Sequence, residues 1–533
     1  MRMPMQRRAL MQATAALPLA AAAGLARPAV AQPAKSRALR FVPQSSLPTL
    51  DPMFSSQVVG NHGFALFDTL YSMDSNGAAR PQMAEGHVVS LDGKLWRIRL
   101  RPGLRFHDGA PVRAIDAMAS LQRWARLNAF GKKMTATVAE WRVIDDRDFE
   151  IVLHRPFPML IDAIAQPGST IAFVLPERLA RTDPFTPLTE MVGSGPYRFV
   201  PDEYVSGSRV VYMRFTGYLP RDEPPDRSTG GKVAHFPRIE WHSIPDASTA
   251  HAALVSSEID WWELPSPDFY AGLGKNPGVL LQIDDPAGKV SFLRLNHLQP
   301  PFNDVRVRRA VLAGVRQDDY MQSVLGDDPS LWRICHSQFP CGTPYEVDDQ
   351  GRSMPASLTV ARQLLKDAGY SGSKAIILAP TDNPLLAPYG AVTADLFAKV
   401  GLDAELATSD WASVVQRRAN RGPVEAGGWS ALYSYGSASS LGNPALNYLM
   451  SASDEASWFG WWRNPAAEDL SQQWLDAPDE AGRRGAGRSL GQLAMTDVAT
   501  VPLGQWFGRT AFHRSITGVL PGPSSYFWNV RPA

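Results

Sequence analysis

The sequence predicts a mixed α/β protein, because strand spacing and helix spacing alternate along it. Residues 95–100 read Leu-Trp-Arg-Ile-Arg-Leu, an alternation of apolar and basic side chains that is typical of a half-buried strand. Val112, Ile115, Met118 and Leu121 then recur at helical intervals, so this strand leads into a helix. In the last third of the chain, strand and helix patterns alternate, which indicates βαβ units and a partly parallel sheet.

The other elements follow from the same spacings. Further strands are expected at 39–42, 149–153, 204–212, 239–244 and 290–296, and helices at 61–70, 247–256 and 305–315. In the last third, helices are expected at 357–368 and 386–400, each closed by a glycine, and strands at 375–378, 403–406 and 501–507.

The composition indicates a large globular protein. The 533 residues are 44% hydrophobic, which is enough chain for two or three lobes. The formal charge of the whole chain is +1, and it becomes −3 once the first 31 residues, with four arginines and no acid, are left out. This near balance argues against nucleic acid or an anionic membrane as the main partner.

The N-terminus resembles an export signal. Arg7 and Arg8 precede an apolar run at 13–26, and Ala29-Val30-Ala31 is a small-x-small cleavage site, so we expect a signal peptide over 1–31 and a mature chain that begins at Gln32. The arginine pair fits the twin-arginine route, and the general secretory route stays open. A membrane anchor is the alternative, but the run is too short to cross about 30 Å of hydrocarbon. No cysteine lies at the cleavage site, so a lipoprotein is not expected.

The two cysteines, Cys335 and Cys341, flank a loop that contains a proline. An exported protein meets an oxidising compartment, which favours a small structural disulfide over the alternative of two free thiols. A redox or metal site would favour a C-x-x-C spacing, which the sequence lacks.

No catalytic or cofactor motif stands out in the sequence. Gly193-Ser194-Gly195 lacks the spacing of a nucleophile elbow, and His235, His242 and His251 match no zinc spacing. No phosphate-binding glycine loop ends in Lys-Ser or Lys-Thr, so ATP hydrolysis would need a separate protein. We therefore expect a protein that is not an enzyme and has no cofactor.

Three motifs occur in one order along the chain. They are LDGKLWRIRLRPGLRFHDGAPVRAIDAMASLQR at 91–123, GSGPYRF at 193–199 and PPFNDVRVRRA at 300–310. Together they resemble the signature of the extracellular solute-binding proteins of family 5, the peptide- and nickel-binding components of bacterial ABC importers.

The resemblance implies a two-lobed periplasmic-binding-protein fold, type II-like, with an inserted subdomain and two hinge strands. The implied boundaries are lobe I at 32–292, with its insertion at about 77–188, lobe II at 293–503, and a return into lobe I at 504–533. The hinges are expected near 292–295 and 503–506.

The resemblance also implies a ligand site. A tryptophan at the position of Trp429 and the residue at Ser430 lie near the family's ligand, Trp411 and Arg418 match cleft residues, and Ser46 and Leu47 match an edge that pairs with an extended peptide backbone. The glycines beside Trp429 favour an exposed backbone that a ligand can approach, although isolated tryptophans are often core residues. The full expected set is Ser46, Leu47, Trp411, Arg418, Gly428, Trp429, Ser430, Leu432, Tyr433, Gln505 and Trp506.

One departure from the family affects the choice of ligand. Peptide-binding members have an aspartate three residues after the cleft tryptophan, where it pairs with the ligand's α-ammonium, and this chain has Leu432. A buried ammonium without a partner is costly, so the change favours an uncharged, blocked or aromatic solute unless Asp410, Glu425 or Asp454 substitutes. A peptide remains the family default.

The leading hypothesis is a periplasmic, monomeric receptor that closes two lobes around a small solute or peptide and delivers it to an ABC permease with a separate ATPase. The alternatives are a secreted hydrolase, which needs a nucleophile or metal cluster, and a sensory or chaperone-like binding protein that works without a transporter.

Overall fold

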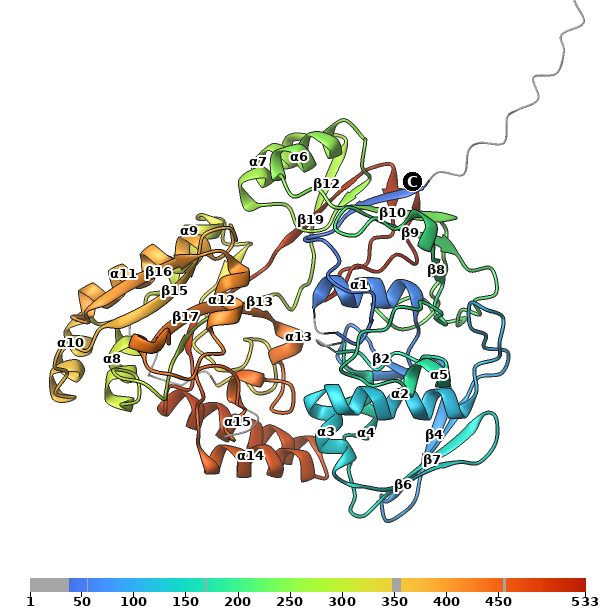
Figure 1. Cartoon of the computed structure of the whole chain (residues 1–533), viewed down its shortest axis with the longest axis horizontal. Coiled ribbons are helices and arrows are strands. Elements are labelled where there is room, and N and C mark those ends of the chain that lie inside the picture. The colour runs from blue at the N-terminus through green and yellow to red at the C-terminus, as the bar shows by residue number, and fades with distance from the viewer. Residues whose placement is uncertain (1–37, 55, 168–169, 348–355, 454–456) are drawn as a thin grey trace, which may run out of the picture. The chain divides into compact units, whose positions relative to one another are not determined.

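A computed structural model describes residues 38–54, 56–167, 170–347, 356–453 and 457–533 of the chain (Figure 1). The expected signal peptide and its cleavage site lie outside these residues. No helix in the described ranges is long and apolar enough to cross a membrane.

The first lobe is built on a seven-stranded sheet in the order β12-β19-β11-β1-β10-β9-β8. Its strands are β1 (Leu39–Val42), β8 (Tyr197–Phe199), β9 (Arg209–Arg214), β10 (Arg238–His242), β11 (Trp261–Trp262), β12 (Val279–Ile283) and β19 (Arg509–His513). The helices of this part are α1 (Gln57–Leu66), α6 (Ala247–Val255) and α7 (Tyr270–Lys275). Because β19 comes from the C-terminal end, the chain returns to the first lobe after building the second.

A four-stranded antiparallel sheet forms a smaller unit within the first lobe, in the order β4-β5-β7-β6. The strands are β4 (Ala84–Val89), β5 (Leu95–Leu100), β6 (Val138–Val143) and β7 (Asp148–Leu153), and the helices beside them are α2 (Ala114–Leu127), α3 (Ala129–Thr135), α4 (Leu160–Ala165) and α5 (Glu177–Ala180). Strand β5 buries its apolar side chains and leaves Arg97 and Arg99 to pair with acids of β7, as the alternation predicts.

The second lobe is built on a six-stranded sheet in the order β14-β18-β13-β17-β15-β16. Its strands are β13 (Lys289–Leu295), β14 (Trp332–Arg333), β15 (Ala375–Pro380), β16 (Ala404–Ser409), β17 (Ala431–Ser437) and β18 (Val501–Trp506). Its helices are α8 (Val305–Gly314), α9 (Gln317–Leu325), α10 (Leu358–Asp367), α11 (Ala387–Val400), α12 (Trp411–Arg417), α13 (Ala438–Leu441), α14 (Pro465–Asp476) and α15 (Glu480–Thr496). Strand β15 runs parallel to β16 and β17, so the predicted partly parallel sheet is confirmed.

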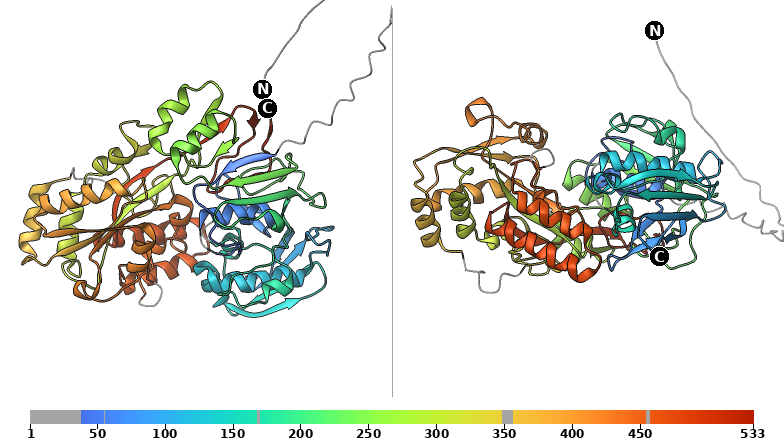
Figure 2. Two further views of the ribbon diagram at one scale, coloured as in Figure 1. Left: turned by 45° about the horizontal axis from the view of Figure 1, so that its top comes forward. Right: turned by 90° about the horizontal axis from the view of Figure 1, so that it is seen from below.

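Four short strands complete the strands of the described residues. They are β2 (Tyr71–Met73) paired with β3 (Ala79–Pro81), and β20 (Ile516–Thr517) paired with β21 (Arg531–Pro532). Figure 2 shows from two further directions that the elements of the seven-stranded sheet and those of the six-stranded sheet occupy separate regions of the described chain.

Two connections join the large sheets, and both lie a few residues from the expected hinges. One connection is residues 284–288, between β12 and β13, and the other is residues 507–508, between β18 and β19. Residues 292–295 and 503–506 belong instead to strands of the second sheet. Lys289, buried at the start of β13, pairs with Asp284 at 2.6 Å and lies 5.1 Å from the centre of the Trp506 ring.

Most predicted elements begin and end within three residues of the observed ones, and two differ by four residues or more. The helix expected at 61–70 is α1, which starts four residues earlier because the Ser56 hydroxyl accepts a hydrogen bond from the Val59 N–H, and which ends where Phe67 becomes extended. The strand expected at 204–212 is β9, which begins only at Arg209, since a turn closed by the Arg209 N–H and the Val205 carbonyl precedes it.

Candidate functional site

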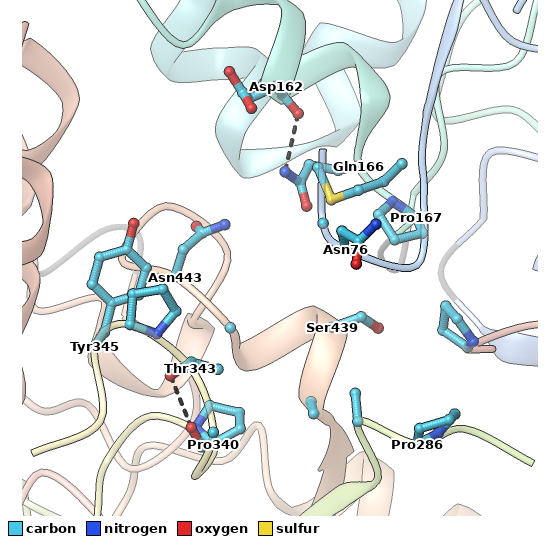
Figure 3. Close-up of a pocket in the computed structure, with 18 of the residues that line it drawn as sticks. Asn76, Asp162, Gln166, Pro167, Pro286, Pro340, Thr343, Tyr345, Ser439 and Asn443 are labelled. Atoms are coloured by element: carbon cyan, nitrogen blue, oxygen red, sulfur yellow. Dashed lines mark hydrogen bonds between the residues drawn. The ribbon is translucent and has the colours of Figure 1, made fainter. Parts of the chain in front are cut away.

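A cavity of about 680 Å³ lies between the two lobes (Figure 3). Residues of both lobes line the cavity. Those of the first lobe include Met73, Asn76, Asp162, Gln166 and Arg227. Those of the second lobe include Arg333, the loop from Pro340 to Tyr345, Ser439 and Asn443, and the connection between the sheets adds Pro286 and Ala287. This volume is in the range of pockets that bind small organic molecules.

The cavity wall carries charges of both signs. Burial raises the pKa of Asp162, and the positive charge of Arg483 on α15 opposes that rise only in part. Arg227 lies 3.7 Å from Asp285. Arg333 donates to the carbonyl oxygen of Cys341 and makes no ion pair with any carboxylate in the described chain.

On one side of this cavity the lobes touch directly. The rings of Phe130 on α3 and Trp474 on α14 are 6.1 Å apart, and Arg155 pairs with Asp476 at 2.5 Å. These contacts hold α14 against the smaller unit of the first lobe (Figure 1).

Cys335 and Cys341 are joined by a disulfide. Cys341 itself lines the cavity, and the backbone beside it carries two hydrogen bonds: its N–H donates to Gln505 Oε1 at 2.9 Å, and Thr343 Oγ1 donates to the Pro340 carbonyl at 2.8 Å. The small loop therefore forms part of the wall on the second lobe (Figure 3).

Trp429 and Ser430 are completely buried just before β17. The Trp429 indole donates to the Arg418 carbonyl at 3.0 Å and packs 5.8 Å from the Trp461 ring. Ser430 Oγ accepts from the Ile376 N–H at 3.1 Å. A ligand would reach either side chain only after its neighbours moved. Both residues were expected to lie near the ligand, but in this structure neither side chain is at a surface.

Leu432 and Tyr433 point to opposite faces of β17, and both are fully buried. Leu432 packs with Trp429 and Trp461. Tyr433 packs on the other side with Tyr389, at 5.9 Å between ring centres, and its hydroxyl has no hydrogen-bond partner in the described structure.

Gly428 is buried, whereas Gly427 before it is exposed, so only part of the backbone that was expected to be open to a ligand is exposed. A Cβ placed on Gly428 would lie 2.1 Å from the carbonyl oxygen of Gly422. The glycine is required because the chain's own backbone, rather than a ligand, approaches it closely.

Trp411 is the first residue of α12, and Arg418 is the residue that caps its C-terminal end. Both are partly exposed. The Arg418 guanidinium lies over two aromatic rings, 4.6 Å from the centre of Phe459 and 5.6 Å from that of Trp458. Burial lowers its pKa.

Gln505 and Trp506 end β18 next to the connections between the sheets. Gln505 Nε2 donates to the Ala287 carbonyl at 2.8 Å and its Oε1 accepts from Cys341, so this buried amide supports two residues of the cavity wall. Trp506 donates to Ser291 Oγ at 3.1 Å.

Ser46 and Leu47 follow β1 in an irregular segment rather than in a strand. Ser46 is exposed, whereas the Leu47 side chain is buried in the core of the first lobe. Within the described residues, neither makes a backbone hydrogen bond, which leaves their polar groups free for an extended ligand.

The expected ligand set thus falls into separate groups, and none of its members lines the 680 Å³ cavity; Cys341, which was predicted only as a disulfide partner, does line it. Sequence patterns missed Asp162, Gln166 and Asn443, because polar residues of helices and loops carry no signal of the cavity they will line. Three carboxylates were considered as replacements for the aspartate that is absent at Leu432. Asp410 caps α12, Glu425 is exposed, and Asp454 lies outside the described residues, so none of them is shown to take that role.

Within the described ranges, no group of three or more His, Cys, Asp or Glu side chains is placed to hold a metal ion.

Comparison with known proteins decides the family. The sequence profile described as bacterial extracellular solute-binding proteins, family 5 Middle, matches residues 78–454. The chain belongs to this family. A family 5 relative from Sinorhizobium fredii, named a probable peptide ABC transporter periplasmic-binding protein, is 34% identical over 92% of each chain.

Solved structures share the fold of this family 5 protein. The periplasmic binding protein AgaA from A. tumefaciens R10, in complex with agropinic acid, has a TM-score of 0.78 at 20% identity and covers 93% of this chain and 99% of its own. A dipeptide-binding protein from Pseudoalteromonas sp. SM9913, in complex with Met-Leu, also has a TM-score of 0.78, at 18% identity, over 93% and 100% of the two chains. The predicted periplasmic-binding-protein fold is therefore confirmed.

Proposed function

We propose that this family 5 protein is the exported substrate-binding component of an ABC importer, which captures a peptide or a peptide-like solute between its lobes. The observation that carries the proposal is the cavity of about 680 Å³, because both lobes and one of the two connections between them contribute to its wall. Such a site is complete only when the lobes are together, so binding and closure are the same event.

The two short connections are the hinges of this motion. The ion pair of Lys289 with Asp284 and the hydrogen bond from Gln505 to Ala287 fix the ends of the strands on either side. The contacts of Phe130 with Trp474 and of Arg155 with Asp476 belong to the closed state, since they join side chains of different lobes.

The wall of the cavity contains none of Ser46, Leu47, Trp411 and Arg418. In this proposal an extended ligand therefore reaches beyond the cavity, to the free backbone groups of Ser46 and Leu47 and to Trp411 and Arg418, which border it from the second lobe. The closed monomer then delivers the solute to a membrane permease that works with a separate ATPase. The signal peptide at 1–31 directs the protein to the periplasm without a lipid anchor.

Native mass spectrometry of mature protein purified from the producing cell tests this proposal. We expect one small solute per chain and a mature N-terminus at Gln32. Asn76→Trp places a large ring in the cavity and should weaken binding of that solute by about 5- to 100-fold, as overpacking of a close-fitting site does. Lys94→Trp adds the same ring in an exposed hairpin turn and should not change binding. Equal affinities for the two variants would mean that the solute binds elsewhere.

A further inference from the structure

Two arginines meet an aromatic pair on the face of the second sheet that carries Leu432. Arg294, Arg418, Tyr448, Trp458 and Phe459 form what we call the Trp458 cluster. The Trp458 ring lies 5.6 Å from the Arg418 guanidinium, 5.9 Å from that of Arg294 and 5.2 Å from the Tyr448 ring. Trp458 and Phe459 also pack against the apolar group that contains Leu432.

Arg418 has no partner for its charge. Its side chain makes no hydrogen bond and no ion pair in the part of the chain that the structure describes, and its Nε is buried. The residue is partly exposed, as are Trp458 and Phe459, so its guanidinium can be reached from outside the cluster. An arginine held over aromatic rings with its donors unused is suited to an incoming carboxylate.

Arg294 adds a second positive charge behind the first. It is 0% exposed and donates to the carbonyl oxygens of Phe459 (2.8 Å), Leu449 (3.0 Å) and Ala499 (2.6 Å), while its Nη2 is buried without a partner. Burial lowers its pKa to about 9, which leaves it charged at neutral pH. No carboxylate of the described chain pairs with it.

The register of β13 and β17 places Arg294 beside Leu432, the position at which peptide-binding members have an aspartate. Arg294 lies directly opposite Leu432 in the antiparallel pair of β13 and β17, so the two side chains share a face. Where those members hold an aspartate for the ligand's ammonium, this chain has an apolar side chain with a buried guanidinium beside it. Among the described residues, the charge beside Leu432 is therefore positive, whereas peptide-binding members have a negative charge at that position.

We infer that the end of the ligand that reaches the Trp458 cluster carries a carboxylate, bound by Arg418, and not a free ammonium. The inference rests on the proposed function, in which Arg418 borders the ligand. Arg294 contributes through its field, since its position behind Trp458 repels an ammonium and favours an anion.

Calorimetry with three matched probes tests the inference: the C-terminal amides of Gly-Phe, N-acetyl-Gly-Phe and N-succinyl-Gly-Phe, which present an ammonium, a neutral amide and a carboxylate at one end and no charge at the other. We expect the succinyl probe to bind most tightly and the free dipeptide most weakly. Arg418→Gln should weaken the succinyl probe by about 10- to 100-fold and leave the acetyl probe nearly unchanged, because only a charge-assisted hydrogen bond is lost.

Three further variants complete the test, and two of them are controls: Arg421→Gln and Leu432→Asn. Arg421→Gln removes an exposed arginine that also lies over an aromatic ring, 5.1 Å from Trp461, but outside the cluster, and it should leave the preference unchanged. Leu432→Asp supplies a carboxylate beside Arg294 and should reduce the preference for the succinyl probe, whereas the uncharged Leu432→Asn should not.

The outcomes separate the two proposals. Binding of the free dipeptide as tight as that of the succinyl probe, or a succinyl affinity unaffected by Arg418→Gln, would overturn this inference and leave the proposed function standing. Failure of all three probes to bind would overturn the peptide-like ligand of the proposed function, and this inference with it.

Discussion

Asp51→Asn should be one of the most destabilising single-atom changes available in the first lobe. Asp51 and Arg123 are both 0% exposed at their side chains and pair at 2.8 Å. The Asp51 carboxylate also accepts two backbone hydrogen bonds. Its Oδ1 accepts from the Met53 N–H at 2.9 Å, and its Oδ2 accepts from the Leu188 N–H at 3.0 Å. An asparagine can keep one of these acceptors, but its NH₂ group would face donors.

The cost follows from what the change leaves behind. Arg123 would keep its bonds to the Thr182 carbonyl and hydroxyl, but its buried charge would be uncompensated. Breaking a buried pair by removing one partner costs about 3–5 kcal/mol. An exposed pair is the comparison: Arg178 and Glu190 are each 49% exposed, so Glu190→Gln should cost about 0–1 kcal/mol.

Equilibrium urea unfolding followed by circular dichroism measures both variants. Adding Arg123→Met to Asp51→Asn should recover part of the lost stability, because it removes the uncompensated charge. If Asp51→Asn costs no more than Glu190→Gln, or if the second substitution makes the protein still less stable, the reasoning about the buried charge is wrong.

Three further outcomes are expected. Replacing Cys335 and Cys341 by serine should lower the free energy of unfolding by about 2 kcal/mol for so short a loop and weaken solute binding, measured by urea unfolding and calorimetry. Burial lowers the pKa of His62 to about 4. As the pH drops from about 6.5 to 4, His62 therefore becomes protonated in the unfolded chain before it does in the folded protein, and the free energy of unfolding should fall. His62→Gln should make the free energy of unfolding less dependent on pH in this range, whereas the same substitution at the exposed His154 should not. Trp429→Ala should cost about 3–5 kcal/mol of stability, so a loss of binding without a loss of stability would place this indole in the ligand site after all.

Local spacing predicted most elements because it reports which face of a segment is buried. Strand β5 shows its apolar alternation in six residues, and α11 is closed by Gly401 at a positive φ of 106°. The start of α1 was missed by four residues because a single side chain, Ser56, decides it. Trp429, Leu432 and Trp461 pack in one apolar group, but the spacing of the aromatic residues could not tell a core from a cleft.

By itself, the sequence determined the fold class and the family, and it showed that Leu432 stands where peptide-binding members have an aspartate. Each of these can be recognised from consecutive or regularly spaced residues. Only the tertiary structure decided that Arg294 lies across from Leu432, that Trp429 is covered on all sides, and that the cavity wall joins Asp162 to the disulfide loop. The physical reason is that register and packing between distant segments depend on the whole arrangement of the sheets, and no local pattern of side chains records them.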